Sequence, residues 1–134
     1  MKNTKKFLEI IVLIVLIGFM LNSCGEKEES SILKIKIINN YEFPITKVVL
    51  RCVGEFDEVF ENLNINGNGG SQTFSIDLNK YGAGNYSGAA IIPIVYASGL
   101  QFDEGDGSYI WAPGKIISKG RTKTFTLDAD GNLY

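Results

Sequence analysis

The chain has 134 residues, with 13 basic and 15 acidic side chains, a formal net charge of −2 and no histidine. No stretch is basic enough to follow the phosphates of a nucleic acid, so nucleic acid is excluded as a partner. The absence of histidine removes the commonest general base, the commonest zinc ligand and every Ser-His or Cys-His nucleophile. We therefore expect a protein that is not an enzyme and needs no cofactor.

The chain begins with the pattern of a secretory signal peptide. Three lysines within the first six residues precede an apolar block at residues 10–21. A signal peptide has an apolar core of about 7–15 residues, whereas a membrane-spanning helix needs about 20. Extending the block backwards would place the carboxylate of Glu9 in hydrocarbon, which is costly. Residues 1–23 are therefore predicted to be a helical signal peptide, and a retained transmembrane anchor is the alternative.

The apolar block ends in Leu21-Asn22-Ser23-Cys24, which resembles the lipobox of bacterial lipoproteins, although Asn22 departs from the commoner small or aliphatic residue. The resemblance implies diacylglycerol on the Cys24 thiol, cleavage before Cys24 and acylation of the new amine, for example with palmitate. Two or more acyl chains hold a protein firmly on a membrane. We therefore expect a lipid-anchored protein of the bacterial cell envelope, on the periplasmic or surface face of the outer membrane.

The lipidated cysteine opens a charged segment, residues 24–30, which is predicted to be a flexible tether because it is too polar to pack. Its Lys27-Glu28-Glu29 is similar to the lysine-plus-two-acids export signal of surface lipoproteins in the Bacteroidetes. Simple solvation of the tether is the alternative interpretation. The remaining residues, 31–134, are enough for one domain with its own core.

Alternating apolar and polar side chains predict strands at residues 30–38 and 45–53. The second strand places Cys52 toward the core, where a thiol behaves as a small, inert hydrophobe. A redox or dimer-forming thiol is the alternative. The expected inward faces are Leu33, Ile35 and Ile37 in the first strand and Thr46, Val48, Leu50 and Cys52 in the second.

A third strand, residues 56–63, carries charges on both faces and is expected at a sheet edge. The glycine-rich loop at 64–70 lacks the lysine and the following helix of a phosphate-binding loop, so we expect a turn that needs positive φ. A fourth strand follows at 71–78. Its expected inward residues are Phe74, Ile76 and Leu78.

The longest apolar run, residues 86–97, is typical of a central strand that is buried on both faces. Pro93 cannot donate a hydrogen bond to a neighbouring strand, so a bulge or a division into two short strands is expected there. Residues 115–118 and 121–127 are the closing strands, with Phe125 and Leu127 inward.

No segment has helical periodicity, and turn signals recur about every 8–12 residues. The predicted fold class is therefore all-β, a single small antiparallel β-sandwich of about seven strands, with a small barrel as the alternative. The domain also resembles short bacterial lipoprotein domains with an immunoglobulin-like or transthyretin-like sandwich. That resemblance implies a fold and no functional residues. Its matching segments are residues 37–40, 45–50, 67–70 and 73–78.

Two acidic clusters offer oxygen ligands of the kind that calcium prefers. The first, Asp103, Glu104 and Asp106, is a weak candidate, since a solvated acidic loop is commoner. The second begins at Asp128 like an EF-hand loop, but the sequence ends at Tyr134, before the position of that loop's bidentate glutamate. No metal site is therefore expected.

The stretch 98–114 is expected to be the longest irregular segment, and it joins Phe102, Tyr109 and Trp111 to the first acidic cluster. Aromatic anchors ringed by polar groups are typical of binding hot spots, and loops often carry function. Burial of Trp111 in the core is the alternative. The expected function is a non-catalytic binding or interaction module that contacts an envelope protein or glycan. A structural subunit of an envelope assembly and a small carboxylate hydrolase are the alternatives.

Overall fold

A computed structural model describes residues 31–105 and 107–134, which contain nine β-strands and one short 3-10 helix. The signal peptide, the lipidation site at Cys24, the tether and Asp106 lie outside the described residues. No helix in the described ranges is long and apolar enough to cross a membrane. The elements are β1 (Ile32–Asn39), β2 (Ile45–Cys52), β3 (Phe56–Phe60), β4 (Gly70–Asp77), η1 (Leu78–Tyr81), β5 (Gly88–Ala97), β6 (Phe102–Glu104), β7 (Gly107–Trp111), β8 (Lys115–Ser118) and β9 (Thr122–Leu127).

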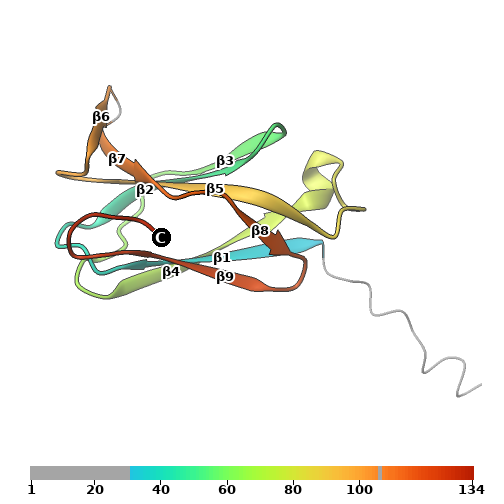
Figure 1. The fold of residues 1–134 in the computed structure, drawn as a ribbon, viewed down its shortest axis with the longest axis horizontal. Coiled ribbons are helices and arrows are strands. Elements are labelled where there is room, and N and C mark those ends of the chain that lie inside the picture. The colour runs from blue at the N-terminus through green and yellow to red at the C-terminus, as the bar shows by residue number, and fades with distance from the viewer. Residues whose placement is uncertain (1–30, 106) are drawn as a thin grey trace, which may run out of the picture.

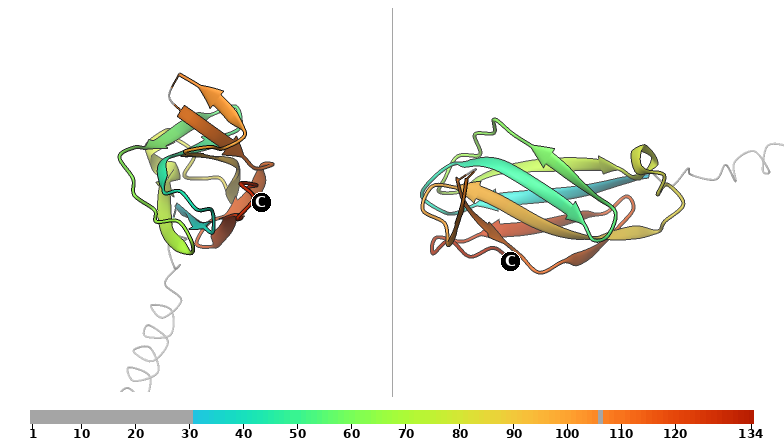
Figure 2. Two further views of the ribbon diagram at one scale, coloured as in Figure 1. Left: turned by 90° about the vertical axis from the view of Figure 1, so that its left-hand side faces the viewer. Right: turned by 90° about the horizontal axis from the view of Figure 1, so that it is seen from above.

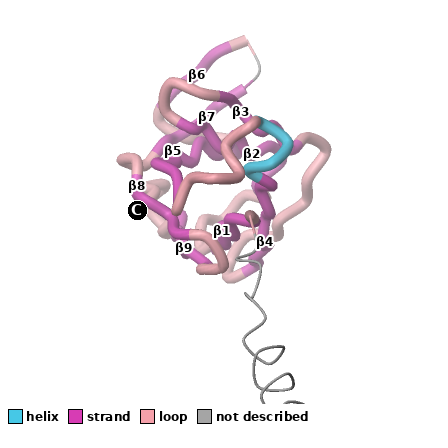
Figure 3. The backbone as a smooth tube through the Cα atoms, turned by 90° about the vertical axis from the view of Figure 1, so that its right-hand side faces the viewer, coloured by secondary structure: helices cyan, strands magenta, loops and turns pink. Residues whose placement is uncertain are grey.

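Two sheets pack face to face, so the predicted β-sandwich is confirmed (Figures 1 and 2). Sheet A has the strand order β4-β1-β9, and sheet B has the order β3-β2-β5-β7-β6, with β8 also paired to β5. Seen along the strands, the two sheets form separate layers with the core between them (Figure 3). Seven of the strands correspond to predicted ones. β6 and β7 are additional, and they lie in the stretch that was expected to be irregular.

Strand β1 is the centre of sheet A. It pairs antiparallel with β4 and parallel with β9, which makes this one pair an exception in an otherwise antiparallel sandwich. Side chains alternate across a strand, and Leu33, Ile35 and Ile37 are all fully buried, as predicted. Phe125 and Leu127 of β9 are also fully buried, so the first and last strands together supply one wall of the core.

Strand β2 turns Val48, Leu50 and Cys52 inward, as predicted, but the inward placement of Thr46 is wrong. The pairing of β2 with β5 shifts register between Ile45 and Lys47, which leaves Thr46 exposed. An extra residue in a strand reverses the alternation locally. The Cys52 residue is 7% exposed, and burial raises the pKa of its thiol, which favours the unreactive protonated form.

Strand β5 is central, as predicted, but the expected burial of both its faces is wrong, since Ala90 is exposed and Ile92 and Tyr96 are only partly buried. The expected bulge or break at Pro93 is also wrong, because β5 runs unbroken from Gly88 to Ala97. One edge of β5 pairs with β2 from Ile91 to Ala97. The other edge pairs with β8 up to Ile91 and with β7 from Ile94 onward, so Pro93 lies between the two partners. The Pro93 carbonyl accepts from the Ala112 N–H at 3.1 Å, on that same edge. The position where Pro93 lacks an N–H therefore faces the gap between the pairing of β5 with β8 and its pairing with β7, so neither pairing loses a hydrogen bond there.

Strand β3 lies at the edge of sheet B, as the charges on both of its faces predict.

The glycine-rich loop between β3 and β4 forms the predicted turn. In the glycine-rich loop Asn68 and Gly69 have φ values of 59° and 112°, in agreement with the predicted positive-φ turn. A Cβ on Gly67 would lie 2.4 Å from the Glu42 carbonyl oxygen, so only glycine fits where this loop passes the β1–β2 connection.

Asn39 is the buried polar residue of the described core, with 0% exposure. Its Nδ2 donates to the Phe43 and Ile65 carbonyl oxygens, each at 2.9 Å. Its Oδ1 accepts from the Tyr41 N–H at 3.1 Å. One side chain therefore fixes the connection from sheet A to sheet B and the glycine-rich loop beside it.

Replacing Asn39 by alanine should lower the free energy of unfolding by about 3 kcal/mol, because buried backbone groups lose their partners. Chemical denaturation followed by circular dichroism measures the change. Asn40→Ala, at the exposed neighbouring position, is the control and should stay within about 0.5 kcal/mol of the parent. Equal midpoints for the two variants would contradict this role of Asn39.

Candidate functional site

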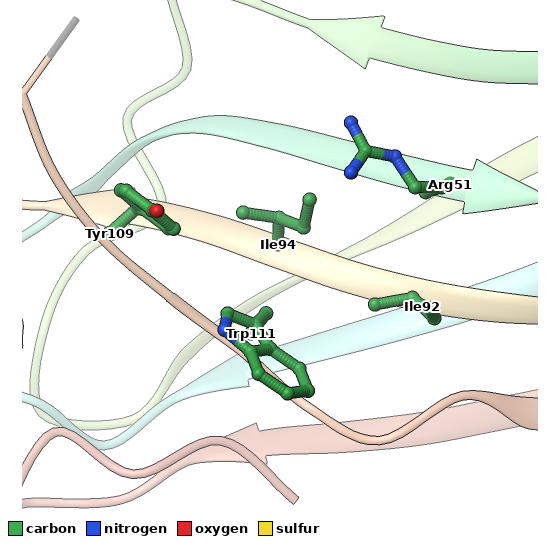
Figure 4. Close-up of a pocket in the computed structure, with 5 residues that line it drawn as sticks. All are labelled: Arg51, Ile92, Ile94, Tyr109 and Trp111. Atoms are coloured by element: carbon green, nitrogen blue, oxygen red, sulfur yellow. The ribbon is translucent and has the colours of Figure 1, made fainter. Parts of the chain in front are cut away.

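The outer face of sheet B contains a hollow of about 310 Å³, lined by Arg51, Ile92, Ile94, Tyr109 and Trp111 (Figure 4). That volume lies at the lower end of the range of small-molecule sites, about 300–1,000 Å³. The lining comes from three neighbouring strands. β2 supplies Arg51, β5 supplies the isoleucines, and β7 supplies the two aromatic residues.

The strand register explains why these residues meet. Ile94 pairs with Val49 on one side and with Trp111 on the other, and Arg51 pairs with Ile92. Directly paired residues point to the same face of a sheet. Because Pro93 points into the core, its neighbours Ile92 and Ile94 both point outward and form the floor of the hollow.

A row of aromatic rings runs beside the hollow. The ring centroids of Tyr96 and Tyr109 are 5.4 Å apart, and those of Phe102 and Tyr109 are 5.5 Å apart. Trp111 follows Tyr109 on the same face of β7 and is 50% exposed. The three predicted binding residues Phe102, Tyr109 and Trp111 are therefore brought together, although Phe102 packs on Tyr109 and does not line the hollow.

Two expectations about this region are corrected. The alternative that Trp111 packs in the core is wrong, because its side chain points outward beside Ile94. The stretch 98–114 is also more regular than expected, since β6 and β7 form a hairpin that extends sheet B. The hairpin was missed because β6 has only three residues, Phe102–Glu104, and is exposed throughout.

Opposite charges are paired around the hollow. The Nε and Nη2 atoms of Arg51 each donate to the Asp57 carboxylate at 2.9 Å. This contact raises the pKa of Arg51 and lowers the pKa of Asp57, so both stay charged. Lys47, which pairs with Tyr96 in the strand register, lies 3.8 Å from the Glu61 carboxylate and 4.7 Å from the centre of the Tyr96 ring. The Arg51–Asp57 and Lys47–Glu61 pairs each carry no net charge.

The acidic residues of the hairpin are used within it. The Ser108 hydroxyl donates to Asp103, and the Tyr109 hydroxyl donates to Glu104 at 3.1 Å, which raises the pKa of Tyr109. As consecutive residues of β6, Asp103 and Glu104 point to opposite faces, a poor arrangement for sharing one cation. The third candidate, Asp106, lies outside the described residues. Within the described ranges no group of three or more potential metal-ligating side chains is found.

The second acidic cluster forms a turn. Asp128 Oδ1 accepts from the backbone N–H of Asp130 at 3.0 Å and of Asn132 at 2.8 Å. These hydrogen bonds to the ionised form lower the pKa of Asp128. The Asp128 carboxylate therefore closes the turn before the C-terminal residues.

Sequence reasoning missed Arg51, Ile92 and Ile94 as parts of the site. Because Leu50 and Cys52 are expected to point inward, alternation implies that Arg51 points outward, but nothing in the local pattern shows which residues lie beside it. The signal that could have found the isoleucines is the segment Ile92-Pro93-Ile94, because an inward proline in a central strand leaves apolar side chains on the outer face.

The chain matches no known protein family and no curated protein sequence. Among solved structures it is similar to an NMR structure of a protein from Eubacterium rectale, at 16% identity and a TM-score of 0.47. The match covers 81% of this chain and 90% of that chain. A similarity at this level assigns no function to the hollow.

Trp111→Ala should change the free energy of unfolding by about 1 kcal/mol or less, because a half-exposed residue on an outer sheet face loses only cross-strand contacts. Phe125→Ala is the comparison. Phe125 is fully buried, and its truncation should cost about 3–5 kcal/mol. Thermal melts of both variants measure the difference. A Trp111→Ala domain that melts like Phe125→Ala would show that this tryptophan is structural.

Proposed function

We propose that the protein is a non-catalytic binding module, held on the bacterial cell envelope by lipid on Cys24, which binds its partner in the hollow on sheet B. The observation that carries the proposal is Trp111, the one tryptophan of the chain, which stands half exposed at the wall of that hollow. Tryptophan, tyrosine and arginine are the residues most enriched in binding hot spots. All three line this hollow together.

The hollow is also supported by a rigid framework. Tyr109 and Trp111 lie on β7, which is paired to β5, and β5 is paired to β2. Side chains on paired strands lose less freedom on binding than side chains on loops, which favours affinity. The row of paired residues that contains Trp111 and Ile94 continues through Val49 to the exposed Val59, and the exposed Phe102 lies beside Tyr109 on the neighbouring row. Exposed apolar side chains that lie together in this way are typical of surfaces that contact a partner.

The titratable groups favour binding over catalysis. A general base must release and take up protons near neutral pH. The pKa values of Arg51 and Tyr109 are raised from already high values, so both groups hold their protons. The pKa of Asp57 is lowered by Arg51, so this carboxylate is a weak base.

The position of the hollow suits an anchored protein. β1 begins at the end of the sandwich opposite β6 (Figure 1). A tether attached before β1 would therefore hold the β6–β7 hairpin on the side away from its attachment point. In that arrangement the hairpin stays accessible to a ligand.

Cys24→Ala should abolish metabolic labelling of the protein with a fatty acid and leave an uncleaved precursor, because the thiol is the acceptor of the lipid. Cys52→Ala is the matched control, since it removes the other cysteine of the chain and should keep the label. Labelling that persists in Cys24→Ala would overturn the lipid-anchor part of the proposal.

Trp111→Ala should also reduce the envelope material that co-purifies with the intact, lipidated protein from its own membranes. The recovered material is analysed for both protein and carbohydrate. Ile116→Ala is the control, because Ile116 is 79% exposed on the same outer face but does not line the hollow. Recovery that is equal for both variants would show that the hollow is not the binding site.

A further inference from the structure

We infer that the hollow binds a neutral carbohydrate, with one face of a sugar ring against Tyr109 and Trp111. The inference rests on the proposed binding function and names its ligand. A sugar ring has apolar C–H groups on its faces and hydroxyl groups around its edge. A binding site for it therefore needs an apolar surface and, beside that surface, groups that both donate and accept hydrogen bonds.

The hollow supplies the apolar surface. Ile92 and Ile94 form an aliphatic floor, and the Tyr109 and Trp111 rings stand beside it (Figure 4). The face of an aromatic ring carries partial negative charge and attracts the weakly positive hydrogens of C–H groups. Stacking on such a ring removes C–H surface from water while the hydroxyl groups at the edge stay solvated.

The border of the hollow supplies the polar groups. Arg51 uses Nε and Nη2 to bind Asp57, and a guanidinium has five N–H donors in total. The pair therefore offers further donors and carboxylate lone pairs at one place, with no net charge. A hydroxyl group is both donor and acceptor and can use both members.

The charges disfavour an anionic ligand. The Arg51 charge is balanced by Asp57 at 2.9 Å, and the Lys47 charge is balanced by Glu61 at 3.8 Å. Glu104, which accepts from the Tyr109 hydroxyl, adds a negative charge beside the aromatic row. A phosphate or carboxylate ligand would find no uncompensated cation among these groups, whereas a neutral polyol needs none.

The site also extends beyond one sugar unit. Tyr96 and Phe102 continue the row of rings from Tyr109, at centroid distances of 5.4 Å and 5.5 Å. The chain's own tether is a poor occupant, because it consists largely of charged residues and because β1, which follows it in the sequence, begins at the opposite end of the sandwich (Figure 1). An oligosaccharide or polysaccharide segment fits this open, aromatic face.

Trp111 makes the experiment direct, because it is the one tryptophan and its fluorescence reports the hollow. The full-length lipidated protein, purified in a detergent without aromatic groups, is titrated with soluble starch, laminarin, xyloglucan and mannan. Polygalacturonate serves as the anionic comparison. We expect a saturable change in fluorescence with at least one of the neutral polysaccharides and none with polygalacturonate.

Variants at Tyr109 separate stacking from other effects. Tyr109→Ala should weaken binding of the neutral polysaccharide by about thirtyfold or more, as for a hot-spot contact. Tyr109→Phe keeps the ring, loses the hydroxyl bond to Glu104, and should stay within about threefold of the parent, well below the effect of a hot-spot truncation. Ile116→Ala, outside the hollow, should bind like the parent.

Three results would overturn the inference: no response to any neutral polysaccharide, a response to polygalacturonate alone, or equal binding by the parent and Tyr109→Ala. If envelope material still depends on Trp111 when no polysaccharide binds, the ligand is a protein. In that case the assignment of a carbohydrate ligand is wrong and the proposed binding function stands. If recovery of envelope material is also independent of Trp111, both proposals fail.

Discussion

The missing N–H of Pro93 is the constraint on which sheet B and its hollow depend. A strand that pairs on both edges must offer a donor at each paired position, and proline offers none. The chain meets this limit by changing the partner of β5: β8 ends its pairing at Ile91, and β7 begins at Ile94. The link between β7 and β8 passes so close that a Cβ on Gly114 would lie 3.1 Å from Ile92 Cγ1. The hollow lies where the partner of β5 changes from β8 to β7. Its floor is formed by Ile92 and Ile94, the two residues that flank the inward Pro93.

The alternation of side chains along the strands separates the residues that stabilise the domain from the residues that line the hollow. Val48, Leu50 and Val95 are fully buried and hold the two sheets together. Their neighbours Arg51 and Ile94 belong to the outer face and line the hollow. Because the two sets interleave residue by residue, the core fixes the positions of the outer side chains without itself lining the hollow. A substitution on the outer face can therefore change the hollow in a domain that stays folded.

The sequence was a good guide to features that depend on local pattern and a poor guide to features that depend on register. Seven strands and most of their inward faces follow from alternation within a single segment, as in Leu33, Ile35 and Ile37. The hollow instead joins Arg51 to Ile92 and Ile94 to Trp111, and no single segment contains these pairings. Trp111 was chosen as a loop anchor, yet it lies on a strand. Its exposure is decided by the pairing of β7 with β5.

The paired charges give the outer face a constant electrostatic character. The hydrogen bonds to Asp57 raise the pKa of Arg51 and lower the pKa of Asp57, so the pair keeps both charges over a wide range of pH. Hydrogen bonding to Glu104 raises the pKa of Tyr109, which keeps the phenol neutral. The pKa shifts of Arg51, Asp57 and Tyr109 all favour the protonation state that each group has at neutral pH. The outer face therefore keeps the same donors, acceptors and ring surfaces over a wide range of pH, as the proposed binding of a neutral carbohydrate requires.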